Sequence, residues 1–260
     1  MDQPSIKTKL SHLPLGDIRY FESVGSTNTL AAAWAERGAP DLSVVLADEQ
    51  TEGRGRSGRK WFTPPGSALA LSVLLRPGAD EDDPQTTRLT ALGALAVAGA
   101  LGDRYGLDAA VKWPNDVLLD RKKTCGVLAE AQWLGAVLQA VILGIGINVA
   151  SPAVPPDELL NYPASCVEAA LGEPVDRLDL LAAVLENLVG LREKVFTVEF
   201  IDLWEARLAF KGEWVRVSGQ TETFEGQVLG LDAHGRLRLK LRSGADKSLT
   251  AGEINVRPLG

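Results

Sequence analysis

Apolar residues follow two different patterns along the chain, one before and one after residue 212. In the first part, apolar runs bounded by polar turns predict strands at 43–50, 67–76, 123–132 and 136–149. Helical spacing predicts helices at 29–37, 85–105, 178–195 and 200–209, and Gly38 is a typical stop for the first of them. This mixed order of elements indicates an α+β fold for residues 1–211.

After residue 212, apolar positions alternate in short stretches that are separated by glycine-containing turns. The alternating groups lie at 214–217, 228–231 and 237–241. Alternation with a period of two predicts short, half-buried strands, and a series of them predicts a small β-barrel. We therefore expect one domain over residues 1–211 and a small second domain over residues 212–260.

A basic, glycine-rich loop lies between the predicted strands 43–50 and 67–76. Residues 53–61 read Gly-Arg-Gly-Arg-Ser-Gly-Arg-Lys-Trp, whereas the whole chain carries a formal net charge of −7. Glycines allow the backbone to approach a ligand closely, and arginines can hold phosphate or carboxylate groups through two hydrogen bonds. The loop is therefore expected to close over an anionic ligand.

Two nucleotide-binding motifs can be excluded for this loop. The dinucleotide motif needs a helix to begin at the glycines, but the chain continues with Trp61-Phe-Thr-Pro-Pro-Gly66, and two prolines oppose a helix there. A P-loop needs Lys and then Ser or Thr after its second glycine, but Arg59 and Lys60 follow Gly58. A solvated basic loop or a nucleic-acid-binding patch stays open as an alternative.

The segment Lys-Trp-Pro-Asn-Asp at 112–116 interrupts a predicted strand. Pro114 cannot donate to a strand ladder, so Lys112 is expected near a distortion or a sheet edge. Asn115 and Asp116 then make a turn or a bulge. The alternative is a surface lysine whose aliphatic chain covers the neighbouring tryptophan.

Two further segments each allow a structural and a functional interpretation. Ser26, Thr27 and Asn28 precede a predicted helix, where they can cap its first turn or bind a ligand with the free backbone N–H groups. In the segment Gly-Ile-Gly-Ile-Asn at 144–148, Gly144 and Gly146 indicate either a β-bulge or the close approach of a ligand ring.

Taken in this order, the segments 53–61, 112–116 and 144–148 resemble the biotin–protein ligases, the biotin–[acetyl-CoA-carboxylase] ligase family. Ser-Thr-Asn at 26–28 and Cys-Gly-Val-Leu-Ala-Glu at 125–130 fit the same order of motifs. The resemblance is strong over residues 20–150 and looser beyond them. It implies a catalytic domain of the class II aminoacyl-tRNA synthetase and biotin–lipoate ligase type, a mixed β-sheet covered by helices, and a C-terminal SH3-like β-barrel.

The resemblance also implies the reaction: biotin and ATP, with Mg²⁺, give biotinyl-5′-AMP and pyrophosphate, and biotin is then transferred to a lysine of a biotin carboxyl carrier protein. It implies catalytic roles for Arg54, Arg56 and Lys112, with Lys112 on the biotin carboxylate and the attacked phosphate. Biotin contacts are implied for Ser26, Thr27, Asn28, Gln50, Gly53, Arg54, Gly55, Arg56, Lys112, Gly126, Gly144 and Gly146. Contacts with ATP or the adenylate are implied for Arg54, Arg56, Arg59, Trp61, Asn115, Lys122 (or its neighbour Lys123) and Asn148.

Composition and length narrow the function classes. The longest mostly apolar run, 137–150, is too short to span a bilayer, and residues 1–10 lack the apolar core of a signal peptide. Two cysteines, Cys125 and Cys166, make no disulfide framework and no metal-ligand spacing, which predicts a cytoplasmic protein with free thiols and no protein-built metal cage. The short lead-in before Ser26 and the net negative charge indicate a family form without a DNA-binding domain.

Four expectations remain open. A lipoate-type protein ligase would share the architecture, and a non-enzymatic DNA-binding or adaptor module would use the basic loop differently. A homodimer is compatible with the sequence. The loop 53–60 is expected to be mobile without ligand and to be ordered by biotinyl-5′-AMP, because its like charges repel and its glycines favour a flexible backbone.

Overall fold

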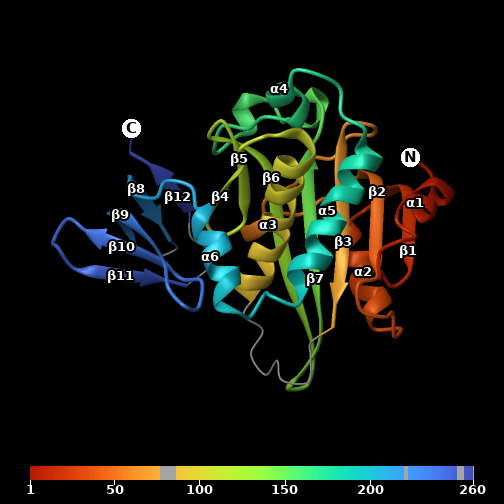
Figure 1. Cartoon of the computed structure of the whole chain (residues 1–260), viewed down its shortest axis with the longest axis horizontal. Coiled ribbons are helices and arrows are strands. Elements are labelled where there is room, and N and C mark those ends of the chain that lie inside the picture. Colours follow the sequence, from red (N-terminus) through yellow and green to blue (C-terminus); the bar gives the residue numbers. More distant parts are fainter. Residues whose placement is uncertain (77–85, 220–221, 251–254, 260) are drawn as a thin grey trace.

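The computed structural model of the protein describes residues 1–76, 86–219, 222–250 and 255–259. The elements form two β-sheets, with the N-terminus and the C-terminal sheet at opposite ends of the molecule (Figure 1). None of the helices in the described part of the chain has the length and apolar character needed to cross a bilayer.

The larger sheet contains seven strands in the order β1-β2-β3-β7-β6-β5-β4. β1 and β2 are parallel and the other neighbouring pairs are antiparallel, so the sheet is mixed as expected. The predicted pair of long strands is confirmed as β6 and β7. The strands are β1 (Ile18–Val24), β2 (Val44–Gln50), β3 (Ala68–Leu75), β4 (Ala110–Lys112), β5 (Asp116–Leu119), β6 (Lys122–Leu134) and β7 (Val137–Asn148).

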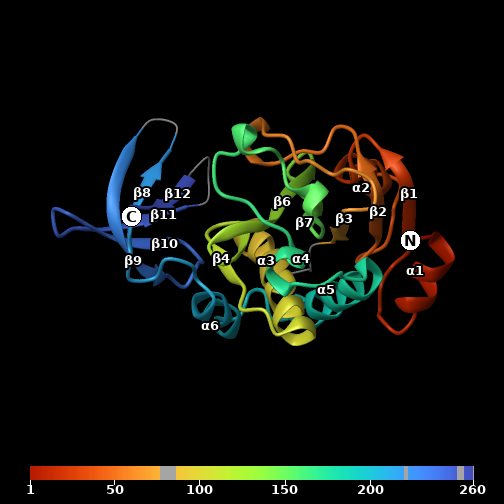
Figure 2. The ribbon, with the colours of Figure 1, turned by 90° about the horizontal axis from the view of Figure 1, so that it is seen from above.

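Helices cover both faces of this sheet: α3 (Thr86–Tyr105) and α5 (Arg177–Arg192) lie on one face, and α2 (Thr27–Ala35) lies on the other (Figure 2). Side chains alternate along β2 accordingly, with Val44 and Leu46 in the core under α3 and α5 and Val45 in the core under α2. All eight residues of β3 are buried because this inner strand is covered on both faces.

Local sequence signals explain several element ends. α5 begins after Asp176, whose carboxylate accepts hydrogen bonds from the backbone N–H groups of Leu178 (2.7 Å) and Asp179 (3.2 Å). Beyond the end of α2, Gly38 has a φ of 82°, which confirms it as the predicted stop. The other helical elements in the described residues are α1 (Gln3–Lys9), α4 (Val167–Leu171), α6 (Val198–Ala206) and the 3₁₀ turns η1 (Arg56–Gly58), η2 (Ser151–Ala153) and η3 (Asp157–Leu159).

The second sheet is antiparallel, with five strands in the order β11-β10-β9-β8-β12. Its strands are β8 (Trp214–Ser218), β9 (Thr223–Leu231), β10 (Leu237–Leu241), β11 (Asp246–Leu249) and β12 (Asn255–Pro258). Within the described residues, β11 and β12 stand at opposite edges and do not pair, so these strands form an open sheet and not a closed barrel.

The turn between β9 and β10 docks this second sheet against the larger one. The indole N–H of Trp113 donates to the carbonyl oxygen of Gly235 at 3.0 Å, and the Arg88 guanidinium donates to the carbonyl oxygen of Ala233. Arg121 also forms two hydrogen bonds with the Glu213 carboxylate, at 2.8 and 2.9 Å. The second sheet thus contacts the residue next to Lys112.

Candidate active site

A single cavity brings together most of the residues that the sequence predicts for the ligand site. It lies between the loop 53–61, the first turn of α2, the centre of the larger sheet and the segment 153–164, and β12 adds Arg257 to its lining. The predicted residues that line it are Ser26, Thr27, Asn28, Gln50, Arg54, Gly55, Arg56, Arg59, Trp61, Lys112, Asn115, Gly126, Gly144, Gly146 and Asn148.

The glycine-rich loop folds back on itself at the cavity. Backbone hydrogen bonds join its two arms. The N–H of Trp61 donates to the carbonyl oxygen of Gly53 (2.8 Å), and the N–H of Gly55 donates to the carbonyl oxygen of Arg59 (2.7 Å). A Cβ on Gly53 would lie 2.4 Å from the Trp61 carbonyl oxygen, so only glycine fits there. Gly53 does not line the cavity, which corrects its predicted ligand contact: it permits the close approach of the two arms.

The indole of Trp61 lies directly on the glycines of β6 and β7. A Cβ would come within 2.3 Å of the ring at Gly146 and within 2.9 Å of it at Gly126. Gly146 pairs regularly with Gly126 and with Ala70 on its two sides, so the β-bulge interpretation of this glycine is wrong. The glycines instead provide a flat surface for an aromatic ring.

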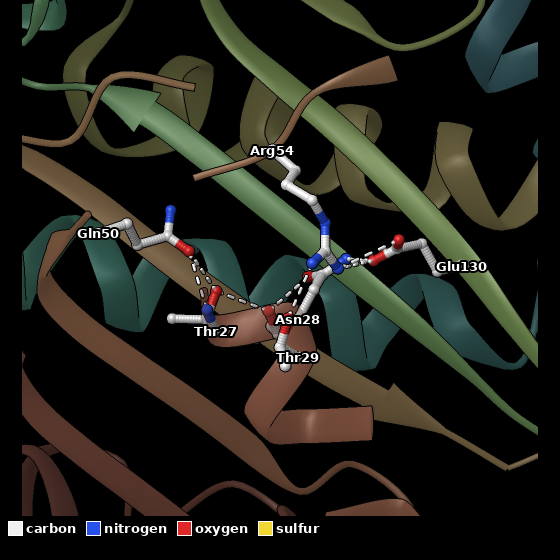
Figure 3. Close-up of polar contacts among 7 residues, drawn as sticks. Thr27, Asn28, Thr29, Gln50, Arg54 and Glu130 are labelled. Carbon is white, nitrogen blue, oxygen red and sulfur yellow. Dashed lines mark hydrogen bonds and ion pairs between the residues drawn. The ribbon is translucent and has the colours of Figure 1, made fainter. Parts of the chain in front are cut away.

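Hydrogen bonds at the start of α2 fix several cavity side chains (Figure 3). The Gln50 carboxamide oxygen accepts from the backbone N–H (2.9 Å) and the hydroxyl (3.0 Å) of Thr27. Ser26 occupies the position before the first helical residue, but its side chain makes no capping hydrogen bond. The predicted cap is therefore replaced by the side chain of Gln50, which arrives from the end of β2.

Asn28 occupies the space that Gly144 leaves open. A Cβ on Gly144 would lie 2.3 Å from the Asn28 side-chain oxygen, and that oxygen accepts from the Ser72 hydroxyl at 2.6 Å. The Asn28 amide nitrogen donates to the Glu130 carboxylate at 2.5 Å, and the same carboxylate is paired with Arg54 at 3.2 Å (Figure 3). Both hydrogen-bonding groups of the Asn28 amide are thus held by the protein.

Two lysines meet one buried carboxylate on the opposite side of the cavity. Asp116 lies 3.2 Å from the ammonium of Lys112 and 2.6 Å from that of Lys123. Lys112 is only 8% exposed, so the surface-lysine interpretation is wrong. Its ammonium also lies 4.3 Å from the centre of the Tyr162 ring, where a cation–π contact contributes.

The electrostatic balance of this group follows from its burial. Burial lowers the pKa of Lys112, and although Asp116 opposes that effect, the pKa stays below its usual value. Burial alone would raise the pKa of Asp116, but Lys123 and Lys112 outweigh it and lower that pKa below 3.8. At neutral pH the carboxylate is therefore ionised.

Lys123, and not Lys122, faces the cavity. Lys122 is exposed and does not line it, whereas Lys123 does, and its ammonium lies 5.4 Å from the centre of the Trp61 ring. The pairing of β5 with β6 shifts register, since Val117 pairs with Cys125 but the next residue pairs with Lys123. The extra residue in β6 reverses the alternation of side chains, and this corrects the predicted role of Lys122.

Several cavity residues were not predicted. Asp116 lies inside a predicted motif and could have been chosen for its charge. Glu130 does not line the cavity but contacts Asn28 and Arg54, which do, and it shares a strand face with Gly126 by the period of two. Tyr162 and Arg257 come from segments whose local sequence contains no ligand signal. Among the described residues that line the cavity, seven are lysines or arginines and one is acidic, so it suits an anionic ligand.

Comparison with known proteins agrees with this arrangement. A model of the biotin/lipoate A/B protein ligase family matches residues 20–148, and a model of the biotin protein ligase C-terminal domain matches residues 212–257. The bifunctional ligase/repressor BirA of Bacillus subtilis (strain 168) is 36% identical over 236 residues, which cover 89% of this chain and 72% of that protein. The biotin–[acetyl-CoA-carboxylase] ligase of Paracoccus denitrificans is 37% identical over 211 residues, 78% of this chain and 87% of that protein.

A solved structure shows the same similarity in three dimensions. Biotin protein ligase from Aquifex aeolicus in complex with biotin and ATP superposes with a TM-score of 0.78 and 31% sequence identity. The match covers 93% of this chain and 99% of that one, and so includes both sheets. From its sequence, its fold and the residues gathered in its cavity, the chain belongs to the biotin protein ligase family.

Proposed function

We propose that the protein activates biotin with ATP and then attaches it to a lysine of an acceptor protein. The observation that carries this function is the group of cations at one end of the cavity. Lys112 and Lys123 share the Asp116 carboxylate, and Arg56 donates to the side-chain oxygen of the adjoining Asn115 at 2.9 Å. Such a group can hold a nucleotide phosphate next to a carboxylate.

In the first step, an oxygen of the biotin carboxylate attacks the α-phosphorus of ATP. A bond forms between them as the bond to the pyrophosphate oxygen breaks, which yields biotinyl-5′-AMP and pyrophosphate. Two anions must approach each other, so cations that touch the α-phosphate lower the barrier by orienting it and by stabilising its charge. Lys112, Lys123 and Arg56 are the side chains that we assign to this task.

In the second step, the neutral amine of the acceptor lysine attacks the acyl carbonyl carbon, and AMP leaves as the amide bond forms. The acyl-adenylate hydrolyses if water reaches it. The loop 53–61 and the segment 153–164 both line the cavity and are suited to exclude water from the intermediate.

The two ends of the cavity suit the two halves of the intermediate. We assign biotin to the end formed by Thr27, Asn28, Gln50 and Gly144, where neutral polar groups lie against the start of α2. We assign the nucleotide to the end formed by the other predicted residues, Arg56, Arg59, Trp61, Asn115 and Asn148, together with Lys123. In the described residues no group of three or more His, Cys, Asp or Glu side chains could hold a metal ion. We propose that Mg²⁺ enters with ATP as the MgATP substrate.

The acceptor that fits this chemistry is a biotin carboxyl carrier protein, and we place the reaction in the cytoplasm. We also propose that residues 1–211 form a catalytic domain of the class II aminoacyl-tRNA synthetase type and residues 212–260 an SH3-like domain. The docked turn at Gly235 gives the second domain a direct connection to Trp113 beside the catalytic lysines.

Biotin is favoured over lipoate because the Paracoccus denitrificans relative and the Aquifex aeolicus structure are biotin ligases at more than 30% identity. The test incubates the protein with MgATP and either biotin or lipoate and measures pyrophosphate release and the mass of the bound adenylate. We expect biotinyl-5′-AMP with biotin and no adenylate with lipoate. Equal adenylation of lipoate would contradict the proposed specificity, and no pyrophosphate release with either acid would contradict the function.

A further inference from the structure

Glu130 occupies a position in the site that the reaction chemistry above does not use. It lies on β6, next to the neutral end of the cavity, and its side chain is 40% exposed. Its carboxylate accepts from the amide of Asn28 at 2.5 Å and faces the guanidinium of Arg54 at 3.2 and 3.3 Å (Figure 3). It is thus a negative charge placed between a cavity side chain and the glycine-rich loop.

Arg54 has two anchors, and both lie outside the loop. One of its terminal nitrogens donates to the Thr29 hydroxyl at 2.8 Å, and the other faces Glu130. These partners belong to α2 and β6, which are well-packed elements of the larger sheet and its cover. Arg54 therefore ties the first arm of the loop to the rigid part of the site.

Arg54 and Arg56 consequently have different surroundings although they are two residues apart. Arg56 donates to Asn115 beside the lysine pair, whereas Arg54 faces Glu130 at the other end of the cavity. The charge of Glu130 offsets that of Arg54, so the pair adds little net positive charge near the phosphate. This arrangement suits an anchor better than a phosphate ligand.

We infer that Glu130 is a positioning residue: it holds the glycine-rich loop over the cavity through Arg54 and at the same time fixes the Asn28 amide. Both carboxylate oxygens of Glu130 take part, because the Asn28 amide donates to one of them and the Arg54 guanidinium faces both. Ser72 holds the other end of the Asn28 amide at 2.6 Å, so the connection runs from buried β3 to the loop. The link to biotin activation rests on the proposed function, whereas the loop anchor itself does not.

The sharpest test replaces Glu130 by glutamine. Glu130→Gln keeps the size of the side chain and one acceptor for Asn28, but it removes the charge that faces Arg54. Glu49→Gln is the matched control, because Glu49 lies on β2 of the same sheet, accepts from Ser23 at 2.7 Å and does not contact the glycine-rich loop through a hydrogen bond in the described residues. Thermal unfolding of both variants checks that the fold is retained.

The first measurement is tryptic cleavage of the ligand-free protein, mapped by mass spectrometry to Arg56, Arg59 and Lys60. A half-exposed ion pair has a modest effect, so we expect cleavage about two- to fivefold faster in Glu130→Gln and unchanged in Glu49→Gln. Equal cleavage of the wild type and Glu130→Gln would overturn the anchor. This measurement needs no substrate, so its result does not depend on the proposed function.

The second measurement distinguishes positioning from general destabilisation. Arg54→Ala should speed loop cleavage as much as Glu130→Gln does, and the double variant should be no faster than either single variant, because both remove the same contact. If the cleavage rate of the double variant rose by the product of the two single effects, the two residues would act independently. In biotin activation, the KM for biotin should rise about fivefold in Glu130→Gln while kcat stays within about twofold, as expected for a lost binding-state contact. An unchanged KM would contradict the role of Glu130 toward biotin even if the loop anchor is confirmed.

Discussion

Asp116 forms an ion pair with Lys112 at 3.2 Å across the tight turn between β4 and β5. Both side chains are buried at the wall of the cavity. The same carboxylate lies 2.6 Å from Lys123. One negative charge thus keeps two ammonium groups together at the site of proposed phosphate binding. Burial alone makes the charge of Lys112 costly, so Asp116 stabilises that charge and holds Lys123 beside it.

Asp116→Asn should therefore destabilise the protein at neutral pH, by about 3 kcal/mol, because the buried Lys112 and the partly buried Lys123 lose their counter-charge. The folded-state pKa of Asp116 is lowered below 3.8, so its stabilising effect is fully present above pH 3.8 and is lost as pH falls through the folded-state pKa. Urea unfolding at pH 7 and at successively lower pH values measures this. A stability difference that stays constant or grows on acidification would contradict the assignment.

Lys112→Ala should reduce adenylation more than biotin binding. The ammonium acts chiefly on phosphate charge that develops in the transition state, and such contacts appear in the rate and not in substrate affinity. A hydrogen bond to a charged group contributes about 1.5–3 kcal/mol, which predicts a loss of about tenfold to a hundredfold in pyrophosphate release. Equal losses in pyrophosphate release and in biotin affinity would show that Lys112 only binds substrate.

Arg56→Ala should leave the fold intact and weaken both biotin and adenylate binding by about tenfold to a hundredfold, from the same range for a charged hydrogen bond. Arg56 lies in a loop outside the hydrophobic core, so thermal unfolding should change little. Titration calorimetry measures the affinities. Arg37→Ala, an exposed arginine just after α2, is the control and should bind both ligands as the wild type does. Wild-type affinity in Arg56→Ala would refute the role of the loop cation.

Ligand binding should protect the glycine-rich loop against trypsin. Residues 53–61 contain Arg54, Arg56, Arg59 and Lys60, and the expectation that they are mobile without ligand stays a prediction. Cleavage of the ligand-free protein should begin in this segment, and biotin with MgATP should suppress it strongly. Early cleavage elsewhere, or cleavage here that both substrates leave unchanged, would rule out loop closure as the way in which water is excluded.

Local patterns in the chain were sufficient to predict most of the larger sheet. The apolar runs at 123–132 and 136–149 became β6 and β7, and Gly38 was recognised as the stop after α2 because these signals act between neighbouring residues. The glycine-rich loop and the segment at 112–116 could also be recognised as candidate ligand segments, because few purely structural roles require their residue types in that order.

Contacts between distant segments set the features that the local pattern left open. Lys112 is buried because β12, Tyr162 and Asp116 surround the cavity that it lines. Lys123 faces the cavity in place of Lys122 because a single extra residue in β6 reverses the alternation of side chains along the strand. Glu130 meets Arg54 across 76 positions of the chain. Such pairs form only when the sheet brings its strands together, and their free energies depend on burial and orientation, which no stretch of sequence specifies on its own.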